Sequence, residues 1–554
     1  MKPITLLTAS LFALTASAQF NNPLSIPPAL DVDTFDLVVD EHVHQFYPGV
    51  STPTYGASAE YLGPTLILHK GDTAHIRVHN DLAQVTSMHW HGLRVPSEFD
   101  GGPQREVLPG EVWNVKYQVK NQAGTYWYHP HPHELTAEQA TFGVAGFIIV
   151  QDADEAALDL PRTYGVDDFP IVVQDRRFNT DGSFVFGPFG DSVLVNGTPR
   201  PYVDLPAQVV RLRLLNGSNS RIYNLGFDDG RSFPVIAGDG GLLSVPASTD
   251  RLLLSNGERD EILLDLSGME GDSLLLMSFG SELPASMPGS SFILWESSAL
   301  NGIDFPVLRI RVGAPTATPV TSIPATLVPT TPPHLGDVSR TRYKSFSGTG
   351  MAGMGMFYIN GLQFNMDVVN DTVALGATEI WRVENASDIA HPFHIHGGSF
   401  YILDRNDMPP PAWEQGPKDV VLVDMADHVR LLMKFDDLTD EGWPLMYHCH
   451  NLMHEDNMMM LQYIVLDANM AVGDAADAPS ISVYPSPSAG QVTYRSTFTV
   501  SEIFVMDQLG RIVLRRAGLS RTSGEVDLQD LPMGTYVLVM RSRTQQARAV
   551  IMRE

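Results

Sequence analysis

Short apolar segments alternate with turn-forming residues along most of the chain. Clear examples are residues 65–68, 144–150, 211–215 and 420–423, each about the length of a strand. Glycine and proline are abundant, with 46 and 39 residues, and no long stretch has the periodicity of an amphipathic helix. This pattern is typical of β-sandwich domains. The sequence therefore predicts an all-β fold.

A weak internal repeat divides these segments into three copies. Each copy ends a strand-like run with the pattern Arg-x-x-Asn, at Asn80, Asn216 and Asn385. Two histidines follow the first and third asparagines at the same offsets, and Leu225 and Phe227 stand at those offsets in the middle copy. We therefore expect three related sandwich domains, of which the first and the third bind a ligand through histidines.

Changes in composition suggest where the domains end. Residues 314–338 are rich in proline and threonine, and residues 468–480 are small and acidic. Lys2, the apolar run 4–14 and the motif Ala16-Ser17-Ala18 are typical of a cleaved signal peptide. The predicted organisation is a signal peptide (1–18), a first domain (19–155), a middle domain without ligands (156–313), a connector (314–338), a third domain (339–467), a linker (468–480) and a small C-terminal β-sandwich module (481–554).

Charge and length narrow the functional classes. The 554 residues carry 64 acidic and 36 basic side chains, a formal net charge of -28. This argues against nucleic acid as a partner, because phosphate binding needs a basic surface. No segment after the signal peptide is long and apolar enough to span a bilayer. We expect an exported protein without a transmembrane segment, and a monomer. Its single cysteine cannot form an internal disulfide.

Ten of the 18 histidines fall into four groups, of which two lie in each histidine-bearing repeat. Alternate residues of a strand share one face, so a His-x-His pair directs two imidazoles to the same side. Four such pairs place eight imidazoles where the first and third domains can meet, a set that suits copper better than calcium or magnesium. The groups are His89 and His91; His129 and His131; His391, His394 and His396; and His448, His450 and His454.

The cysteine lies inside the last group. Cys449 stands between His448 and His450, so its sulfur points to the opposite face of the strand. There it can meet His391 and His454. One thiolate, two imidazoles and a weak axial thioether form a blue electron-transfer copper site, and Met459 is the axial candidate. The first repeat has Pro130 at the position of the cysteine, so we expect no such site there.

Four motifs of this chain resemble, in order and spacing, the copper motifs of the multicopper oxidases. They are His89-Trp90-His91-Gly92, His129-Pro130-His131, the run from His391 to Gly397, and His448-Cys449-His450 with His454. The resemblance covers residues 30–467 and is nearest to three-domain bacterial laccases and cuprous oxidases. It implies three cupredoxin-like Greek-key sandwiches and four copper ions.

The resemblance also implies which residues hold each ion. Type 1 copper is assigned to His391, Cys449 and His454 with Met459 axial, and type 2 copper to His89 and His394. The type 3 pair is assigned to His91, His129, His131, His396, His448 and His450. The implied reaction takes single electrons from a donor and reduces dioxygen to water. Asp100 and Glu455 match carboxylates that deliver protons in the family, and their alternative interpretation is as ordinary loop acids.

The donor is the least determined part of the prediction. Oxidation of phenols or aromatic amines is the default for the family. The alternative is oxidation of Cu(I), for which Met354 and Met356 in a Gly-Met segment, together with Asp419, form a possible substrate-metal site. The same segment can instead be a flexible loop. From a different class, a protein that only binds copper needs ligands but not the placement of Cys449 between two histidines.

The C-terminal module has a composition of its own. Residues 481–554 contain nine arginines, six acidic residues and no histidine. The motifs Tyr484-Pro485-Ser486-Pro487 and Asp507-Gln508-Leu509-Gly510-Arg511, with the run 531–536, resemble those of a C-terminal type IX secretion sorting domain. A carbohydrate-binding or adhesion module is the alternative. The resemblance implies a secretion machinery as partner and a location outside the cell or on its surface, with the periplasm as the alternative.

Overall fold

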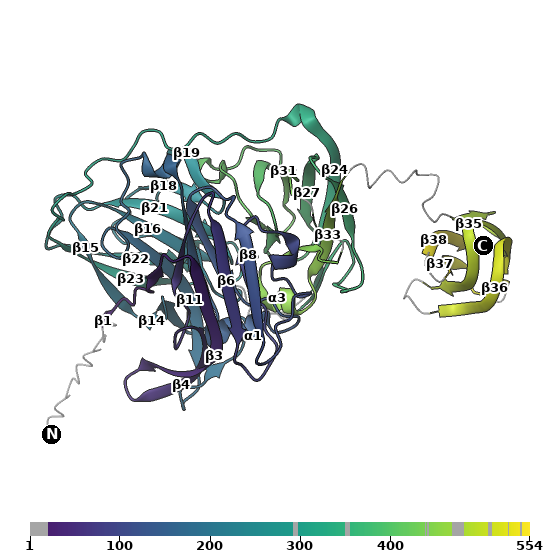
Figure 1. Ribbon diagram of the computed structural model, residues 1–554, viewed down its shortest axis with the longest axis horizontal. Helices are drawn as coiled ribbons and strands as arrows, with labels where there is room; N and C mark the ends of the chain where they lie inside the picture. Colours follow the sequence, from purple (N-terminus) through teal and green to yellow (C-terminus); the bar gives the residue numbers. More distant parts are fainter. Residues whose placement is uncertain are drawn as a thin grey trace, which may run out of the picture. The chain divides into compact units, whose positions relative to one another are not determined.

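The computed structural model describes residues 20–291, 297–349, 355–437, 439, 442–467, 481–507, 512–529, 531–542 and 546–554. They fall into two compact units, residues 1–466 and 467–554. The predicted signal peptide and the predicted linker at 468–480 lie outside the described residues. Strands dominate both units (Figure 1), which confirms the all-β prediction.

The first sandwich is built from two sheets that share one apolar core. The strand orders are β4–β3–β6–β8 and β2–β5–β10–β9–β7. The bounds are β2 (Ala29–Leu30), β3 (Thr34–Tyr47), β4 (Val50–Ala57), β5 (Thr65–His69), β6 (Thr73–Asn80), β7 (His89–His91), β8 (Val112–Gln118), β9 (Gly124–His129) and β10 (Gly146–Gln151).

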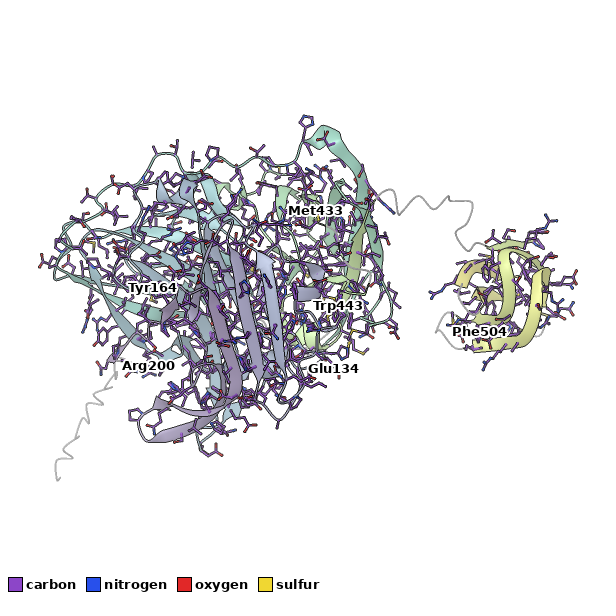
Figure 2. All side chains as sticks on the ribbon, in the orientation of Figure 1. Glu134, Tyr164, Arg200, Met433, Trp443 and Phe504 are labelled. Atoms are coloured by element: carbon purple, nitrogen blue, oxygen red, sulfur yellow. The ribbon has the colours of Figure 1, made fainter. Side chains whose placement is uncertain are left out.

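The third sandwich repeats this plan. Its sheets have the orders β25–β24–β27–β31–β29 and β26–β33–β32–β28–β30, and the labelled Met433 in Figure 2 belongs to their common core. The bounds are β24 (Val338–Thr349), β25 (Met356–Ile359), β26 (Asp371–Ala374), β27 (Thr378–Asn385), β28 (His391–Ile395), β29 (Phe400–Arg405), β30 (Val420–Val423), β31 (His428–Lys434), β32 (Leu445–Cys449) and β33 (Met460–Leu466).

The middle sandwich has a larger core and longer sheets. The orders are β1–β15–β23–β22–β17–β20 and β14–β13–β11–β16–β21–β18–β19, with β12 beside β11. Strand β1, near the start of the chain, pairs with β15 of this sandwich. The bounds are β1 (Asn22–Pro23), β11 (Asp168–Phe178), β12 (Phe184–Val185), β13 (Ser192–Val195), β14 (Thr198–Pro199), β15 (Pro201–Pro206), β16 (Val209–Asn216), β17 (Tyr223–Phe227), β18 (Phe233–Gly238), β19 (Gly241–Thr249), β20 (Leu252–Leu254), β21 (Arg259–Asp265), β22 (Ser273–Phe279) and β23 (Asp304–Gly313).

The asparagine of each repeat makes the same set of hydrogen bonds. The Nδ2 groups of Asn80, Asn216 and Asn385 each donate to two backbone carbonyls, and each Oδ1 accepts from the backbone N–H two residues further on. All three side chains are buried, where a hydrogen-bonded amide fixes the turn that follows its strand. This asparagine clamp explains why the repeat is visible in the sequence.

The histidine strands occupy equivalent places in the first and third sandwiches. In the first, β7 pairs with β9 so that His89 lies opposite His129. In the third, β28 pairs with β32 so that His394 lies opposite His448. The corresponding pair in the middle sandwich is Leu225 opposite Ser278. At this equivalent position, the strand pairing therefore sets two histidines opposite each other in the first and third sandwiches, but not in the middle one.

Short helices and an extended segment complete the first unit. The α-helices are α1 (Thr136–Phe142), α2 (Ala153–Ala156) and α3 (Leu452–Asp456), and the 3₁₀ helices are η1 (Ser97–Phe99), η2 (Gly280–Glu282), η3 (Leu335–Asp337) and η4 (Ala412–Glu414). Residues 314–334 form neither helix nor strand. None of the helices in the described part of the chain is long and apolar enough to cross a membrane.

The second unit has a sheet and a core of its own. Its strands follow the order β34–β35–β37–β38, with β36 beside β35, and Phe504 is labelled in Figure 2. The bounds are β34 (Ile481–Tyr484), β35 (Gln491–Met506), β36 (Ile512–Asp527), β37 (Gly534–Arg541) and β38 (Gln546–Arg553). The predicted C-terminal module is thus an all-β unit.

Candidate metal centre

A cysteine and two histidines converge inside the third sandwich. The Sγ atom of Cys449, at the end of β32, lies 3.4 Å from His391 Nδ1 and 3.5 Å from His454 Nδ1. All three side chains are fully buried. One soft sulfur and two imidazole nitrogens facing one point form a donor set suited to copper. We call these three residues the cysteine site.

The chain turn after β32 brings His454 back to the cysteine. Asn451 caps helix α3 by accepting a hydrogen bond from the Met453 N–H, and His454 lies on that helix. The Met459 carbonyl accepts from the Cys449 N–H at 3.1 Å, and the Met459 N–H donates to the His454 carbonyl at 2.9 Å. Met459 is buried in the same apolar core as Cys449. The backbone therefore ties Met459 to both residues.

Aromatic rings and one hydroxyl enclose the cysteine site. The ring of Phe357 lies 4.8 Å from that of His391 and 4.5 Å from that of His454, centroid to centroid. His391 Nε2 is 2.8 Å from Ser387 Oγ, which leaves its Nδ1 to face the sulfur. These contacts hold the two imidazoles in a buried environment.

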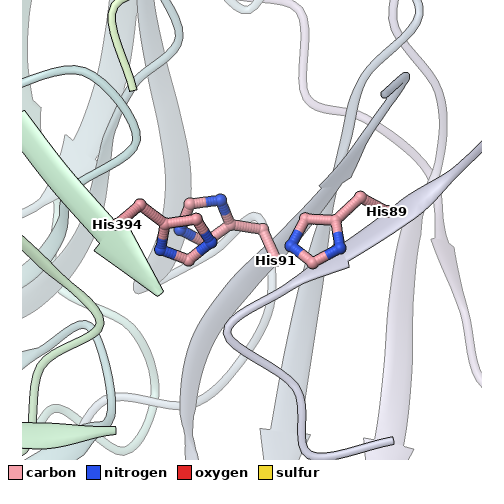
Figure 3. Close-up of side chains that lie close together, drawn as sticks. All are labelled: His89, His91 and His394. Atoms are coloured by element: carbon pink, nitrogen blue, oxygen red, sulfur yellow. The ribbon is translucent and has the colours of Figure 1, made fainter. Parts of the chain in front are cut away.

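Eight other histidines gather where the first and third sandwiches meet, and each is at most 1% exposed. They form two triplets of close nitrogen atoms, His91 with His129 and His450, and His131 with His396 and His448. His89 and His394 complete the set, and Figure 3 shows their rings beside that of His91. We call these eight residues the histidine cluster. It is composed of the eight imidazoles expected from the four His-x-His pairs.

Hydrogen bonds to backbone carbonyls decide which nitrogen of several imidazoles faces inward. His89 Nδ1 is 2.9 Å from the Asp100 carbonyl, and His394 Nδ1 is 2.8 Å from the Asp419 carbonyl. A carbonyl only accepts, so each Nδ1 carries the proton and each Nε2 presents a lone pair. Both Nε2 atoms are buried without a hydrogen-bond partner, as expected of nitrogens that coordinate a metal.

Burial sets the protonation states of both groups. Burial lowers the pKa of six cluster imidazoles well below the ordinary value, and neighbouring residues lower it further. The six are His91, His129, His131, His394, His396 and His450. Burial also lowers the pKa of His448 to about 3. Neutral imidazole is the form that binds metals. Burial also raises the pKa of the Cys449 thiol, so a metal must displace its proton on binding. The donor atoms and their charge states fit copper at both places.

Two buried carboxyl groups lie beside the triplet of His131, His396 and His448. Asp100 Oδ2 accepts from His396 Nδ1 at 2.7 Å, and its other oxygen is buried without a partner. Glu455 lies 3.4 Å from His131 Nδ1 and 3.2 Å from His448 Nδ1. Burial raises the pKa of Glu455 well above its ordinary value, and neighbouring Asp456 adds to the effect. Both acids predicted from the sequence are thus inside the protein and beside imidazoles.

The residues expected at a substrate-metal site lie in different environments. Asp419 is 1% exposed, and its two carboxylate oxygens accept hydrogen bonds of 2.7 Å from Arg259. Arg259 thus pairs with both oxygens of Asp419, and a substrate-metal role for Asp419 stays a prediction. Met356 is 59% exposed on β25. Met354 lies outside the described residues.

Sequence reasoning missed Arg259 altogether. It starts strand β21 of the middle sandwich and reaches Asp419 of the third. An isolated arginine belongs to no metal motif. Arg259 also lies in the middle domain, where no ligand was expected, so no signal in the sequence pointed to it.

Comparisons with known proteins agree with this geometry. Two family models described as multicopper oxidase match residues 39–155 and 328–469, and a model described as secretion system C-terminal sorting domain matches residues 482–553. Multicopper oxidase mco of Staphylococcus haemolyticus is 33% identical over 429 residues, which cover 76% of this chain and 85% of that protein. Cell division protein FtsP of Escherichia coli is 34% identical and covers 83% of this chain and 96% of its own length.

Solved structures give the same result. The laccase-like multi-copper oxidase CueO of Ochrobactrum sp. superposes with a TM-score of 0.72 and 34% identity, over 80% of this chain and all of that one. A metallo-oxidase of Campylobacter jejuni gives a TM-score of 0.69 and 25% identity, over 81% of this chain and 96% of its own. The chain belongs to the multicopper oxidase family, whose members bind copper, typically four ions, and use dioxygen as electron acceptor. Its sorting domain indicates export.

Proposed function

We propose that this protein is a laccase-like oxidase that couples one-electron oxidation of phenolic or aromatic donors to the reduction of dioxygen to water. One observation carries the proposal. Cys449 belongs to the cysteine site, while His448 and His450 on either side of it belong to the two triplets of the histidine cluster. A short covalent path through three consecutive residues therefore joins the place where a donor is oxidised to the place where oxygen is reduced.

The proposed ligand sets follow the two groups. His391, Cys449, His454 and Met459 hold type 1 copper, and His89 and His394 hold type 2 copper. Each triplet of the cluster holds one ion of the type 3 pair, through His91, His129 and His450 or through His131, His396 and His448. Copper bound in these sets supplies one-electron oxidation at the first and four-electron reduction of dioxygen at the others.

The surrounding residues keep the sites dry and move protons. Phe357 covers both imidazoles of the cysteine site. Glu455, with its raised pKa, holds a proton close to His131 and His448, and Asp100 accepts a hydrogen bond from His396. Reduction of oxygen to water consumes protons, and buried carboxyl groups at these distances can deliver them.

Two observations support a phenolic donor. The similar Ochrobactrum enzyme is described as active towards lignin model compounds and lignosulfonate. The sorting domain favours work outside the cell or on its surface, where such donors occur, and type IX secretion machinery is the proposed partner.

Cu(I) is the second candidate donor. The Campylobacter jejuni relative is described as a metallo-oxidase. Here, the net charge of -28 attracts cations, and the exposed Met356 offers a soft thioether close to Phe357, which covers the cysteine site.

Oxygen uptake by the copper-loaded protein tests these alternatives. We expect uptake with a substituted phenol at a kcat/KM clearly above that with Cu(I). A reversed preference would favour the metal-ion oxidase. Copper binding without uptake for either donor would favour a protein that only binds copper. Cys449→Ser is the matched control, because it keeps the histidine cluster and removes the thiolate.

A further inference from the structure

The middle sandwich contributes no predicted ligand, yet one of its turns reaches the histidine cluster. This turn runs from Ser255 to Glu258, between β20 and β21, and leads into Arg259, the first residue of β21. Arg259 is fully buried, and its guanidinium donates to backbone carbonyls of both the first and the middle sandwich. The acceptors are Thr125 O at 3.1 Å, Gly257 O at 2.9 Å and Asp239 O at 2.8 Å. The remaining hydrogen bonds of the guanidinium go to Asp419 in the third sandwich, so Arg259 links all three.

The target in the third sandwich is Asp419. Arg259 Nη1 and Nη2 donate to the two carboxylate oxygens at 2.7 Å each, a bidentate pair. Asp419 Oδ1 is also 3.0 Å from His91 Nε2, and the Asp419 backbone carbonyl accepts from His394 Nδ1. One arginine therefore holds a residue that touches two imidazoles of the cluster, one from each histidine-bearing sandwich.

The contact with Asp419 gives His91 an orientation different from its neighbours. His91 Nε2 faces the carboxylate, so Nδ1 faces the cluster and lies 3.1 Å from His450 Nε2 and 3.4 Å from His129 Nε2. The other imidazoles turn Nε2 inward, as His396 and His448 do, whose Nε2 atoms lie 3.0 Å apart. A carboxylate that accepts from Nε2–H leaves the lone pair on Nδ1.

A second contact shows that the turn fits closely against the cluster. Gly257 has φ +81°, and a Cβ atom added there would lie 2.9 Å from the ring of His450. The turn thus packs on one imidazole of the His91 triplet and holds another through Arg259 and Asp419.

We propose that Arg259 is a positioning residue for the copper cluster. By clamping Asp419 it fixes the ring orientation and the tautomer of His91, so that Nδ1 is the coordinating atom. The ligand-free middle domain then has a defined part in building the oxygen-reducing site. This inference rests on the proposed ligand assignment.

The test compares Arg259→Lys with Arg221→Lys. Arg221 is a matched control, since it is a buried arginine of the same sandwich that donates to an aspartate, Asp175, and has no contact with the cluster in the described structure. We expect Arg259→Lys to keep the blue absorption of the cysteine site and to weaken copper binding at the cluster roughly 10- to 100-fold in a chelator competition. Its electron paramagnetic resonance spectrum should show loss of coupling within the type 3 pair.

Two further variants extend the test: Asp419→Asn alone serves if Arg259→Lys proves poorly folded, and the double variant serves if Arg259→Lys folds. Asp419→Asn retains the shape of the side chain and should weaken the cluster similarly. The double variant should be no worse than the poorer single variant, because both changes remove one contact. Additive losses, or an Arg259→Lys protein with the copper content and spectrum of Arg221→Lys, would overturn the inference. A wild-type protein that fails to load the cluster would instead contradict the proposed function.

Discussion

Cys449 and His448 are adjacent on β32 but belong to different sites. The sulfur of Cys449 lies 3.4 Å from His391 Nδ1, and His448 Nε2 lies 3.0 Å from His396 Nε2. The alternation of side chains along a strand produces this division, since consecutive residues face opposite sides. The two sites are therefore separate in their ligands and continuous in the backbone.

Replacement of the cysteine should separate the two functions. We expect Cys449→Ser to lose the blue absorption band and one copper ion per chain, because a hydroxyl is a poor ligand for this site. The histidine cluster should keep its copper, and donor oxidation should fall to background. Metal analysis with absorption and paramagnetic resonance spectra checks this. A variant that still oxidised the donor at the wild-type rate would contradict the assigned electron path.

Removal of the Glu455 carboxyl should slow only the oxygen half of the reaction. We expect Glu455→Gln to reduce the rate of reoxidation by dioxygen roughly 10²- to 10⁴-fold, because an amide cannot release a proton to the reacting oxygen. Stopped-flow measurement of the two half-reactions separates them, and reduction of the blue site by the donor should be unchanged. Glu134→Gln, an exposed glutamate near the second histidine pair, is the control. Equal reoxidation rates in both variants would refute the proton role.

The contact of Asp437 with the first sandwich should make stability depend on pH in acid. Asp437 accepts from Arg94 and Lys120. Burial alone would raise the pKa of Asp437, but hydrogen bonds from these two side chains outweigh it and lower the pKa below 3.8. The stabilisation is therefore complete above the ordinary pKa and is lost as the pH falls through the lowered one.

Asp437→Asn tests this dependence. We expect it to destabilise the protein by about 1 kcal/mol near neutral pH. The difference from wild type should shrink below about pH 4, since the wild-type carboxylate then also becomes protonated. Thermal unfolding across the pH range measures it, with Asp436→Asn, an exposed neighbour paired with Lys434, as control. A constant difference at every pH would show that charge is not the cause.

Deletion of residues 481–554 should affect location and not chemistry. The C-terminal unit has its own sheet and core, and its sequence matches a sorting domain. We expect the shortened protein to load copper and oxidise donors as wild type does, and to stay within the cell envelope. Activity in culture medium, on the cell surface and in the periplasm locates it. Normal export after deletion would contradict the sorting role.

The sequence predicted most of the fold and most of the site for physical reasons. Strand periodicity and the repeated asparagine are local signals, and His-x-His places two imidazoles on one face wherever the strand lies. Other features depend on contacts between distant segments. The sequence could not show that His91 turns its Nδ1 inward, nor that Arg259 already occupies Asp419, because the pair lies 160 positions apart.

The asparagine clamp has a consequence for how the enzyme is assembled. Asn80 and Asn385 fix the turns that precede His89 and His394 with amide and backbone groups alone. Each of these turns is therefore fixed by hydrogen bonds within its own sandwich, which form as the chain folds. The two turns need no copper ion to hold them, so the polypeptide can form them before copper binds.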